Sequence, residues 1–220
     1  MAHCFFELGC EELPSSSINA LHQHFERKVS DIPTQFRLGV GRFKIMMTPR
    51  RIIIELHDVD EHQQTWTHVI QGPKLSQCHT SDGALSPAAN GFLNKHGLTF
   101  EEAQDAELDR LVYQDSQGGQ RSQALMQDII DGLFAQLPGI KGMRWGSGND
   151  VFPRPVHWLC ALWDGEVLPI TLMGLTSANV SYGHRFLAPD AFEVDASRWE
   201  QQLLEHYVVA DPNKRKDKIL

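Results

Sequence analysis

At 220 residues, the chain is long enough to bury a sizeable core, and its 41% hydrophobic and 22% charged residues are ordinary for a globular protein. No apolar run reaches the roughly 18 residues that a membrane span needs, so an integral membrane protein is excluded. The net charge of −8 excludes a uniformly basic nucleic-acid-binding protein but allows a local basic patch. The N-terminus lacks the basic start of a secretory signal, which predicts a cytoplasmic protein.

The cysteines and histidines form none of the local motifs that bind metals. The four cysteines are scattered, with no Cys-x-x-Cys pair, which favours buried free thiols over disulfides or zinc ligands in a reducing compartment. The 11 histidines include no His-Glu-x-x-His arrangement, and no phosphate-binding glycine loop or nucleophile elbow is present. The sequence therefore predicts no metal site, no cofactor site and no catalytic constellation in this chain.

The first third of the chain alternates strand and helix patterns. Apolar runs rich in β-branched residues predict strands, and apolar residues at helical spacing behind a proline predict a helix. The expected strands cover residues 4–8, 43–47, 52–56 and 66–73, and the expected helix covers residues 15–30. Pro49 divides the second and third strands, which indicates a hairpin or a kinked strand.

The middle of the chain is predicted to be mostly helical. Ser86 precedes a proline, as a helix N-cap often does, and Gly97 has the position of a helix end. Thr99 and Glu102 have the spacing of a capping box. The other expected elements here are a strand at 109–114 and a helix at about 121–136.

The order of these patterns predicts an α+β fold. Residues 156–174 predict a hairpin, because Asp-Gly divides two apolar runs. Strands on both sides of a helical middle predict a mixed sheet that is covered by helices 15–30 and 121–136. We expect one α+β domain at residues 1–210, with a helical insertion at about 83–140. Residues 211–220 are expected to start a helix that leads into a further C-terminal part.

Two arginines follow Pro49 at a tight turn. Successive side chains in a strand point to opposite faces, so at most one of Arg50 and Arg51 can be buried and paired. The pair is interpreted either as a surface turn bound to carboxylates or as a clamp on a phosphate or carboxylate.

A second candidate group lies in the tryptophan-rich stretch from Met143 to Trp163. Arg154 stands between two prolines, which fix the local backbone and aim the side chain. Arg144 and Trp145 are of the types that stack on bases, and His157 alternates with Trp158 along a strand. These residues are interpreted either as a binding surface or as part of the core.

A third candidate group is the glycine-led pair His184 and Arg185. Gly183 allows close backbone approach or a positive φ, and the pair supplies hydrogen-bond donors. The alternative is a buried polar network that holds a loop. Because the arginines of all three groups lie at turns or strand ends, we expect them to converge into one positive area.

Seven segments, taken in order, carry a family resemblance over nearly the whole chain. They are ELGCEELP, MTPRRIIIEL, Gly72-Pro73, AANGFLNKHGL, MRWGSG, FPRPVHWLCAL and YGHRFLAP. Their order and spacing resemble the N-terminal region of the bacterial glycyl-tRNA synthetase beta subunit. The chain departs from that pattern at Cys10, where threonine is usual, and at Ser15 and Ser16, where proline or alanine is frequent.

The resemblance implies a subunit that joins an alpha subunit in a heterotetramer, which attaches glycine to tRNA using ATP. ATP and magnesium are then expected in the alpha subunit, while this chain supports recognition of glycine tRNA. The fold is expected to be similar to the α+β domain of the phenylalanyl-tRNA synthetase beta chain. The candidate tRNA- or phosphate-binding residues are Arg50, Arg51, Arg144, Trp145, Arg154, His157, His184 and Arg185.

Two other functions stay open. The chain is alternatively a stand-alone tRNA- or protein-binding module without ligase activity. A hydrolase that edits mischarged tRNA is a third interpretation, against which the lack of a metal motif counts. Self-association of the chain also stays open.

Overall fold

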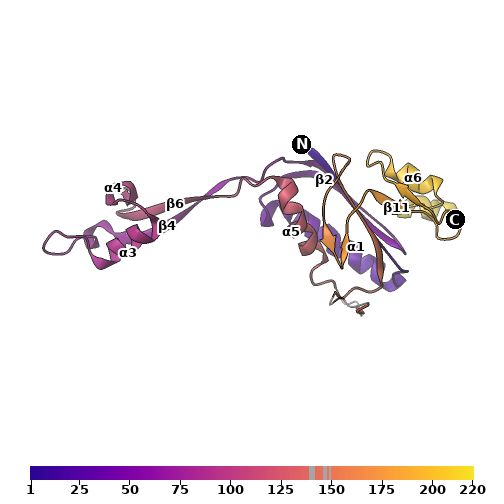
Figure 1. The fold of residues 1–220 in the computed structure, drawn as a ribbon, viewed down its shortest axis with the longest axis horizontal. Helices are drawn as coiled ribbons and strands as arrows, with labels where there is room; N and C mark the ends of the chain where they lie inside the picture. Colours follow the sequence, from indigo (N-terminus) through magenta and orange to yellow (C-terminus); the bar gives the residue numbers. More distant parts are fainter. Residues whose placement is uncertain (139–141, 146–147, 149) are drawn as a thin grey trace. The chain divides into compact units, whose positions relative to one another are not determined.

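The computed structural model describes residues 1–138, 142–145, 148 and 150–220, which divide into two compact units (Figure 1). Unit 1 consists of residues 1–63 and 120–220, and unit 2 of residues 64–119. The chain leaves and re-enters unit 1 at neighbouring positions, since the Gln63 amide donates to the Gln120 carbonyl at 2.8 Å.

An antiparallel sheet of five described strands, in the order β2-β3-β1-β7-β8, forms the centre of unit 1. The strands are β1 (Ala2–Cys10), β2 (Val40–Thr48), β3 (Arg51–Val59), β7 (Val156–Trp163) and β8 (Glu166–Val167). The predicted α+β class is confirmed, but this sheet is antiparallel rather than mixed. Tight turns make β2–β3 and β7–β8 hairpins, and hairpin partners must be antiparallel. The direction of β1 between β3 and β7 depends on long connections, which local patterns do not define.

The two faces of this sheet have different uses because side chains alternate along each strand. Phe6 and Leu8 belong to the larger core, which α1 (Ser15–Ser30) and α5 (Ser122–Phe134) cover. Phe5 of β1 belongs to a smaller core on the other face, together with residues of α6 (Trp199–Glu205). Figure 1 shows α1 and α5 on one side of the sheet and α6 on the other.

The other elements of unit 1 are short. They are α2 (Ile32–Gln35), β9 (Thr171–Leu172), β10 (Leu175–Thr176), β11 (Val180–Tyr182), β12 (Ala191–Glu193) and α7 (Pro212–Ile219). The Asp211 side chain caps α7 by accepting from the next backbone amides, so a helix begins where the sequence predicts one. Across the described part of the chain, no helix is both long enough and apolar enough to cross a bilayer.

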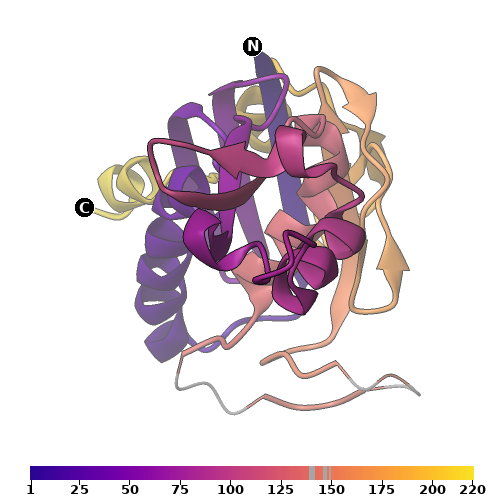
Figure 2. The ribbon, with the colours of Figure 1, turned by 90° about the vertical axis from the view of Figure 1, so that its left-hand side faces the viewer.

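Unit 2 has a small sheet and core of its own. Its elements are β4 (Trp66–Lys74), η1 (Leu75–Gln77), α3 (Pro87–His96), α4 (Phe100–Ala103), β5 (Gln104–Asp105) and β6 (Arg110–Gln117), with the strand order β4-β6-β5. Figure 2 shows its two helices beside these strands. The predicted caps are present: Ser86 accepts from the Ala89 amide, Gly97 is left-handed at φ 66°, and Thr99 and Glu102 form a capping box.

The bounds of unit 2 differ from the helical insertion expected at about 83–140. The unit begins earlier, because β4 pairs with β6 along most of its length. It ends earlier, because α5 packs its apolar stripe against the main sheet and α1. Membership of a unit is decided by these long-range pairings, which a helical pattern does not reveal.

A glycine in β1 makes room for a tryptophan in β7. Gly9 faces Trp158 across the strand pair, and a Cβ atom built on Gly9 would lie 1.9 Å from the indole ring. A side chain at this position must therefore displace the ring.

We expect Gly9→Ala to lower the free energy of unfolding by about 1–3 kcal/mol, as overpacking does. The matched control is Gly132→Ala in α5, where an added Cβ meets nothing within 4 Å. It should raise the free energy of unfolding by up to about 1 kcal/mol, because alanine favours a helix interior. Urea denaturation measures both, and equal effects of the two substitutions would contradict the packing of Trp158 over Gly9.

Candidate functional site

A buried ion pair lies on the face of the main sheet opposite α1 and α5. Glu7 of β1 is 1% exposed and Arg51 of β3 is 2% exposed. Arg51 Nη1 donates to Glu7 Oε1 at 3.0 Å, and Arg51 Nη2 donates to the Tyr182 carbonyl at 2.8 Å. Burial lowers the pKa of Arg51, and the neighbouring Glu7 carboxylate opposes that shift. The pair fixes the end of β3 to β1 and β11.

Two further donors satisfy the buried carboxylate. Trp158 Nε1 donates to Glu7 Oε1 at 3.2 Å, and Ser181 Oγ donates to the same oxygen at 2.9 Å. The Arg51 guanidinium also lies 5.5 Å from the centre of the Trp158 ring, within cation–π range. Residues of four strands, β1, β3, β7 and β11, thus meet at Glu7.

A cavity of about 370 Å³ opens beside this network, and we call it the arginine cavity. Its charged and aromatic lining comes from the turn after β1, the β2–β3 turn, β7, the end of β11 and the segment after it. These lining residues are Glu11, Arg50, His157, Trp158, Tyr182 and Arg185. The cavity therefore collects side chains that are far apart in the sequence.

The arginines of the cavity are held loosely by carboxylates. Arg50 Nη2 lies 3.6 Å from Glu11 Oε1, and Arg185 Nη1 lies 3.7 Å from Glu12 Oε1. Both distances exceed the roughly 2.7–2.9 Å of a charge-assisted hydrogen bond. Arg50 Nε is buried and has no hydrogen-bond partner among the described residues. The guanidinium groups thus keep donors that an anionic ligand could use.

His157 and Arg154 contact the same acidic turn. His157 Nε2 lies 3.0 Å from Glu11 Oε1, so the imidazole and Arg50 share one carboxylate. Arg154 Nε donates to the Glu12 carbonyl at 2.9 Å, outside the lining of the cavity. Arg154 therefore holds the backbone of the turn, while His157 faces the cavity.

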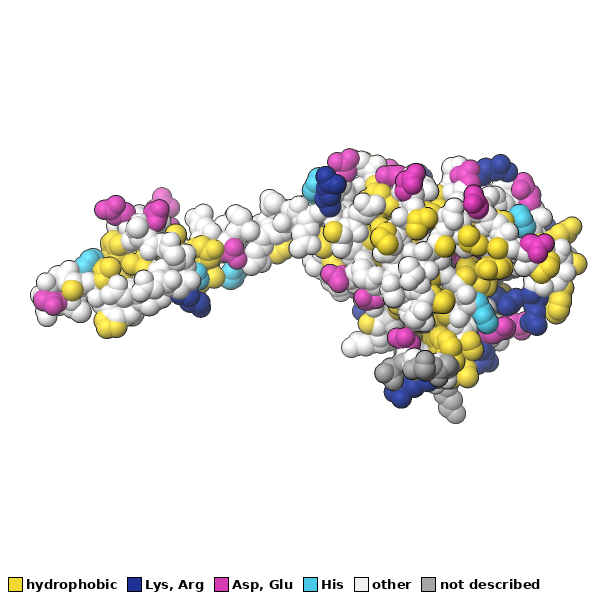
Figure 3. Space-filling model, viewed as in Figure 1, with side chains coloured by type: hydrophobic (Ala, Val, Ile, Leu, Met, Phe, Trp, Pro, Cys, Tyr) yellow, Lys and Arg dark blue, Asp and Glu magenta, His cyan; other side chains and the backbone are white. Residues whose placement is uncertain are grey.

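The structure separates the eight residues that the sequence singles out. Arg50, His157 and Arg185 line one cavity, and Arg154 adjoins it. Arg51 lies buried beneath it in the pair with Glu7, as expected for one member of an Arg-Arg pair in a strand. Figure 3 shows acidic and basic side chains interspersed over the visible face of unit 1 rather than one wide basic area.

The remaining three candidates lie outside this lining. Arg144 is exposed. Trp145 is partly buried and packs against the larger core that α1 and α5 cover. Gly146 and Ser147 of the MRWGSG segment are outside the described residues. His184 Nδ1 accepts from the Phe186 and Leu187 amides at 3.3 Å each, so its ring shapes the loop after β11.

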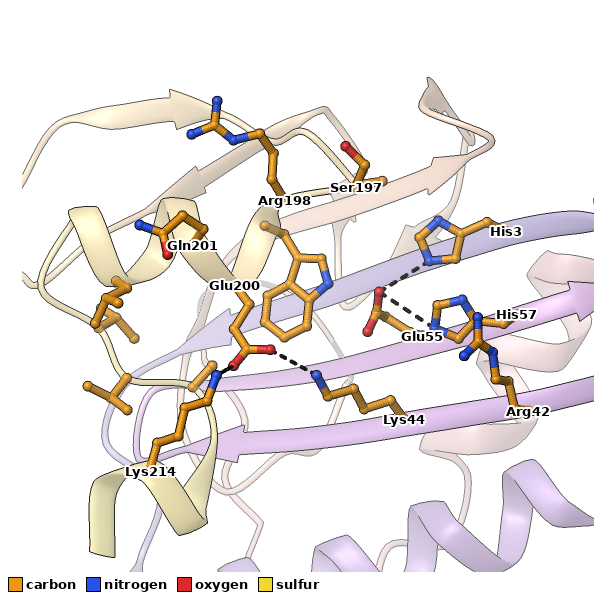
Figure 4. Close-up of a pocket in the computed structure, with 16 residues that line it drawn as sticks. His3, Arg42, Lys44, Glu55, His57, Ser197, Arg198, Glu200, Gln201 and Lys214 are labelled. Atoms are coloured by element: carbon orange, nitrogen blue, oxygen red, sulfur yellow. Dashed lines mark hydrogen bonds and ion pairs between the residues drawn. The ribbon is translucent and has the colours of Figure 1, made fainter. Parts of the chain in front are cut away.

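A second cavity of about 680 Å³ lies at the other end of the same sheet face (Figure 4). Its floor carries His3 of β1 together with Glu55 and His57 of β3. The distance from Glu55 Oε1 to His3 Nε2 is 3.2 Å, and that to His57 Nε2 is 3.9 Å. Burial acts to raise the pKa of Glu55, but hydrogen bonds from His3 and Trp199 leave that pKa below its ordinary value.

No local sequence pattern marks this cluster. Its histidines are 54 positions apart in the numbering and meet because β1 and β3 are neighbours in the sheet. The available indication is the spacing of Glu55 and His57, which places both side chains on one face of a strand. That spacing alone is too common to mark a site.

Comparisons with known proteins agree with the resemblance that the motifs carry. A family model described as "Glycyl-tRNA synthetase beta subunit" matches residues 4–220. The chain is 35% identical to the glycine--tRNA ligase beta subunit of Syntrophotalea carbinolica, with 99% of this chain and 32% of the relative aligned. It is 34% identical to that of Moorella thermoacetica, with 97% and 31% aligned. The chain thus spans about a third of the length of these relatives.

We expect Arg51→Met to lower the free energy of unfolding by about 3–5 kcal/mol, because it leaves the Glu7 carboxylate buried without its cation. The double variant Glu7→Gln with Arg51→Met should lose less than the sum of the two single variants, with a coupling of about 1–3 kcal/mol. Chemical denaturation of all four proteins measures this cycle.

The matched control is Arg198→Met, which removes an arginine from an exposed pair with Glu205 at 3.4 Å. Its effect should stay below about 1 kcal/mol. Strict additivity in the Glu7–Arg51 cycle would contradict a direct interaction of the pair.

Proposed function

Because the chain belongs to the glycyl-tRNA synthetase beta-subunit family, we propose that it is the N-terminal module of such a subunit and binds glycine tRNA through the arginine cavity. In this proposal the module works with an alpha subunit, in the cytoplasm, during attachment of glycine to tRNA. Its own contribution is binding and assembly rather than chemistry.

The observation that carries the proposal is the convergence of Arg50, His157 and Arg185 on one cavity. A phosphate group is recognised by guanidinium donors arranged around it. The long contacts of 3.6 and 3.7 Å to Glu11 and Glu12 leave donors for this purpose. Binding of a phosphate would also supply an acceptor beside the Arg50 guanidinium.

Aromatic groups beside the arginines favour a nucleic acid over a small free anion. Trp158 and Tyr182 line the cavity with ring centres 5.1 Å apart. In the next loop the Arg185 guanidinium lies 4.7 Å from the ring centre of Phe186, which is 74% exposed. Exposed rings and arginine planes are the surfaces on which unpaired bases stack. We therefore assign the cavity to the backbone of tRNA and the loop to an adjacent base.

Glu11 and Glu12 limit the strength of this interaction. They place negative charge against the same arginines, and the whole chain has a net charge of −8. Binding by this module should therefore be weak and sensitive to salt. Weak binding suits a module that supplies only one of several surfaces that contact the tRNA.

The proposal assigns no catalytic step to this chain. Phosphoryl chemistry requires cations and magnesium-binding acids positioned together around the nucleotide. The arginine cavity has acids that pair with its arginines, and its aromatic base suits stacking rather than a triphosphate. ATP and magnesium are accordingly assigned to the alpha subunit.

The double variant Arg50→Ala with Arg185→Ala should weaken binding of glycine tRNA by roughly tenfold, or about 1.4 kcal/mol. It should also reduce the slope of log affinity against log salt concentration by about one to two, as expected for two lost phosphate contacts. Filter binding or fluorescence anisotropy at several salt concentrations measures both.

The control variant is Arg27→Ala, which removes one exposed positive charge from α1 outside the cavity. It should leave both the affinity and the slope almost unchanged. If the double variant binds tRNA normally but no longer co-purifies with the alpha subunit, the cavity serves assembly and the tRNA assignment is wrong.

The 220-residue chain alone should give no glycine-dependent exchange of pyrophosphate into ATP, whereas an alpha subunit with its complete partner should give exchange. Exchange by the chain alone would overturn the non-catalytic assignment. If the chain binds tRNA but never associates with an alpha subunit, a stand-alone binding module becomes the better interpretation.

A further inference from the structure

The cluster of His3, Glu55 and His57 has the composition of a transition-metal site. The three candidate ligand atoms all lie within 4.8 Å of one another. Two imidazoles and one carboxylate form a known ligand set for zinc, and imidazole nitrogen selects zinc-like ions over calcium or magnesium. None of the three residues lines the arginine cavity.

The sheet itself brings the three side chains together. Glu55 and His57 alternate onto one face of β3, and the pairing between β1 and β3 shifts register between Ala2 and Cys4. At this irregularity His3 faces His57 and Asp58, and Asp58 has a φ of 54°. Bulges of this kind redirect side chains beside functional sites.

The backbone of His3 is held in place independently of the cluster. Its amide donates to Asp164 Oδ1 at 2.7 Å, and its carbonyl accepts from the Asp164 amide at 2.8 Å. The His3 and His57 rings stack with centres 4.6 Å apart and an angle of 15° between their planes. The two imidazoles are therefore pre-arranged beside each other, and both present Nε2 to the same carboxylate oxygen.

The donor distances suit a zinc-sized ion after small side-chain rotations. Ligand bonds of about 2.0–2.1 Å at tetrahedral angles place donor atoms about 3.4 Å apart. The observed separations from Glu55 Oε1 are 3.2 Å to His3 and 3.9 Å to His57. The two histidine side chains are 26% and 25% exposed and border the cavity, so they have room to close the remaining distance.

The charges around the cluster are compatible with a cation. Lys44 lies opposite Glu55 in the β2–β3 ladder, and it pairs with Glu200 at 2.9 Å (Figure 4). Arg42 lies opposite His57 in the β2–β3 ladder and pairs with Asp58 at 3.7 Å. Lys44, which shares Glu200 with Lys214, and Arg42 thus pair with carboxylates other than Glu55, which is 5% exposed and contacts the histidines.

We propose that His3, Glu55 and His57 bind one divalent ion of the zinc type, with a fourth position that faces the cavity and holds water. The ion would join β1 to β3 at the edge of the cavity that α6 covers. This site is separate from the arginine cavity, so the proposal does not depend on the tRNA-binding assignment.

The test measures metal binding by the 220-residue chain without a polyhistidine tag. After treatment with a chelator, the protein is titrated with Zn²⁺ against a chromogenic chelator, and Co²⁺ is used to read coordination from its visible spectrum. We expect one tightly bound ion per chain and a four-coordinate Co²⁺ spectrum. Zn²⁺ should also raise the melting temperature, because it binds the folded state.

Two ligand variants and one matched control decide the assignment. His3→Asn and His57→Asn should each weaken Zn²⁺ binding at least about tenfold, because changes in the surroundings of a ligand alone already cost 10- to 100-fold. The control is His22→Asn, which removes a partly exposed histidine from the His22–Glu26 pair on α1, at 3.4 Å. It should bind Zn²⁺ as the unaltered chain does.

Three results would overturn the proposal. They are the absence of a stoichiometric ion, equal affinity in the two ligand variants and the unaltered chain, and loss of binding in the His22 variant alone. Denaturation of each metal-free variant separates loss of a ligand from loss of folding. If one variant fails to fold, the other still tests the site.

Discussion

The buried pair of Glu7 and Arg51 is the interaction on which the rest of unit 1 depends. Transferring a carboxylate and a guanidinium from water into a sheet face costs several kcal/mol for each ion. The pair is tolerated because Trp158 and Ser181 also donate to Glu7, and the Tyr182 carbonyl accepts from Arg51. These partners come from β7 and β11, so the charges can be satisfied only when four strands occupy the positions observed.

The arginine cavity is a consequence of this arrangement. Arg50 and Arg51 are adjacent, yet one guanidinium is buried in the sheet and the other reaches the cavity. Gly9 leaves space for the Trp158 ring, which links the buried pair to the cavity wall. Residues that bind a ligand and residues that hold the fold are therefore next to each other, and the family motifs contain both kinds.

The two faces of the main sheet have different roles: one carries the main core, and the other carries both candidate sites. The face toward α1 and α5 carries the largest apolar core. The other face has an apolar centre under α6, with the Glu7–Arg51 network at one end of β1 and the His3–Glu55–His57 cluster at the other. The polar groups at these ends are stabilised by one another, because Glu7 and Arg51 are buried but hydrogen-bonded, and His3 and His57 border a cavity beside Glu55. Both candidate sites accordingly lie at strand ends, over a scaffold that the helix-side core stabilises.

The sequence by itself determined the local structure of this protein and its family. The helix caps at Ser86 and Thr99, the helix over residues 15–30 and the α+β class follow from short-range hydrogen bonding and periodicity, which act between neighbours in the chain. The ordered motifs identified the beta-subunit family, which the family model over residues 4–220 confirms.

Tertiary structure decided which motif residues share a site. It placed Arg50 beside Arg185, left Arg144 apart, and brought His3 to Glu55 through the pairing of β1 with β3. It also decided that β4 belongs to unit 2 and α5 to unit 1. These outcomes depend on strand order and on which face each side chain occupies, and both are set by the packing of segments distant in sequence rather than by any local pattern.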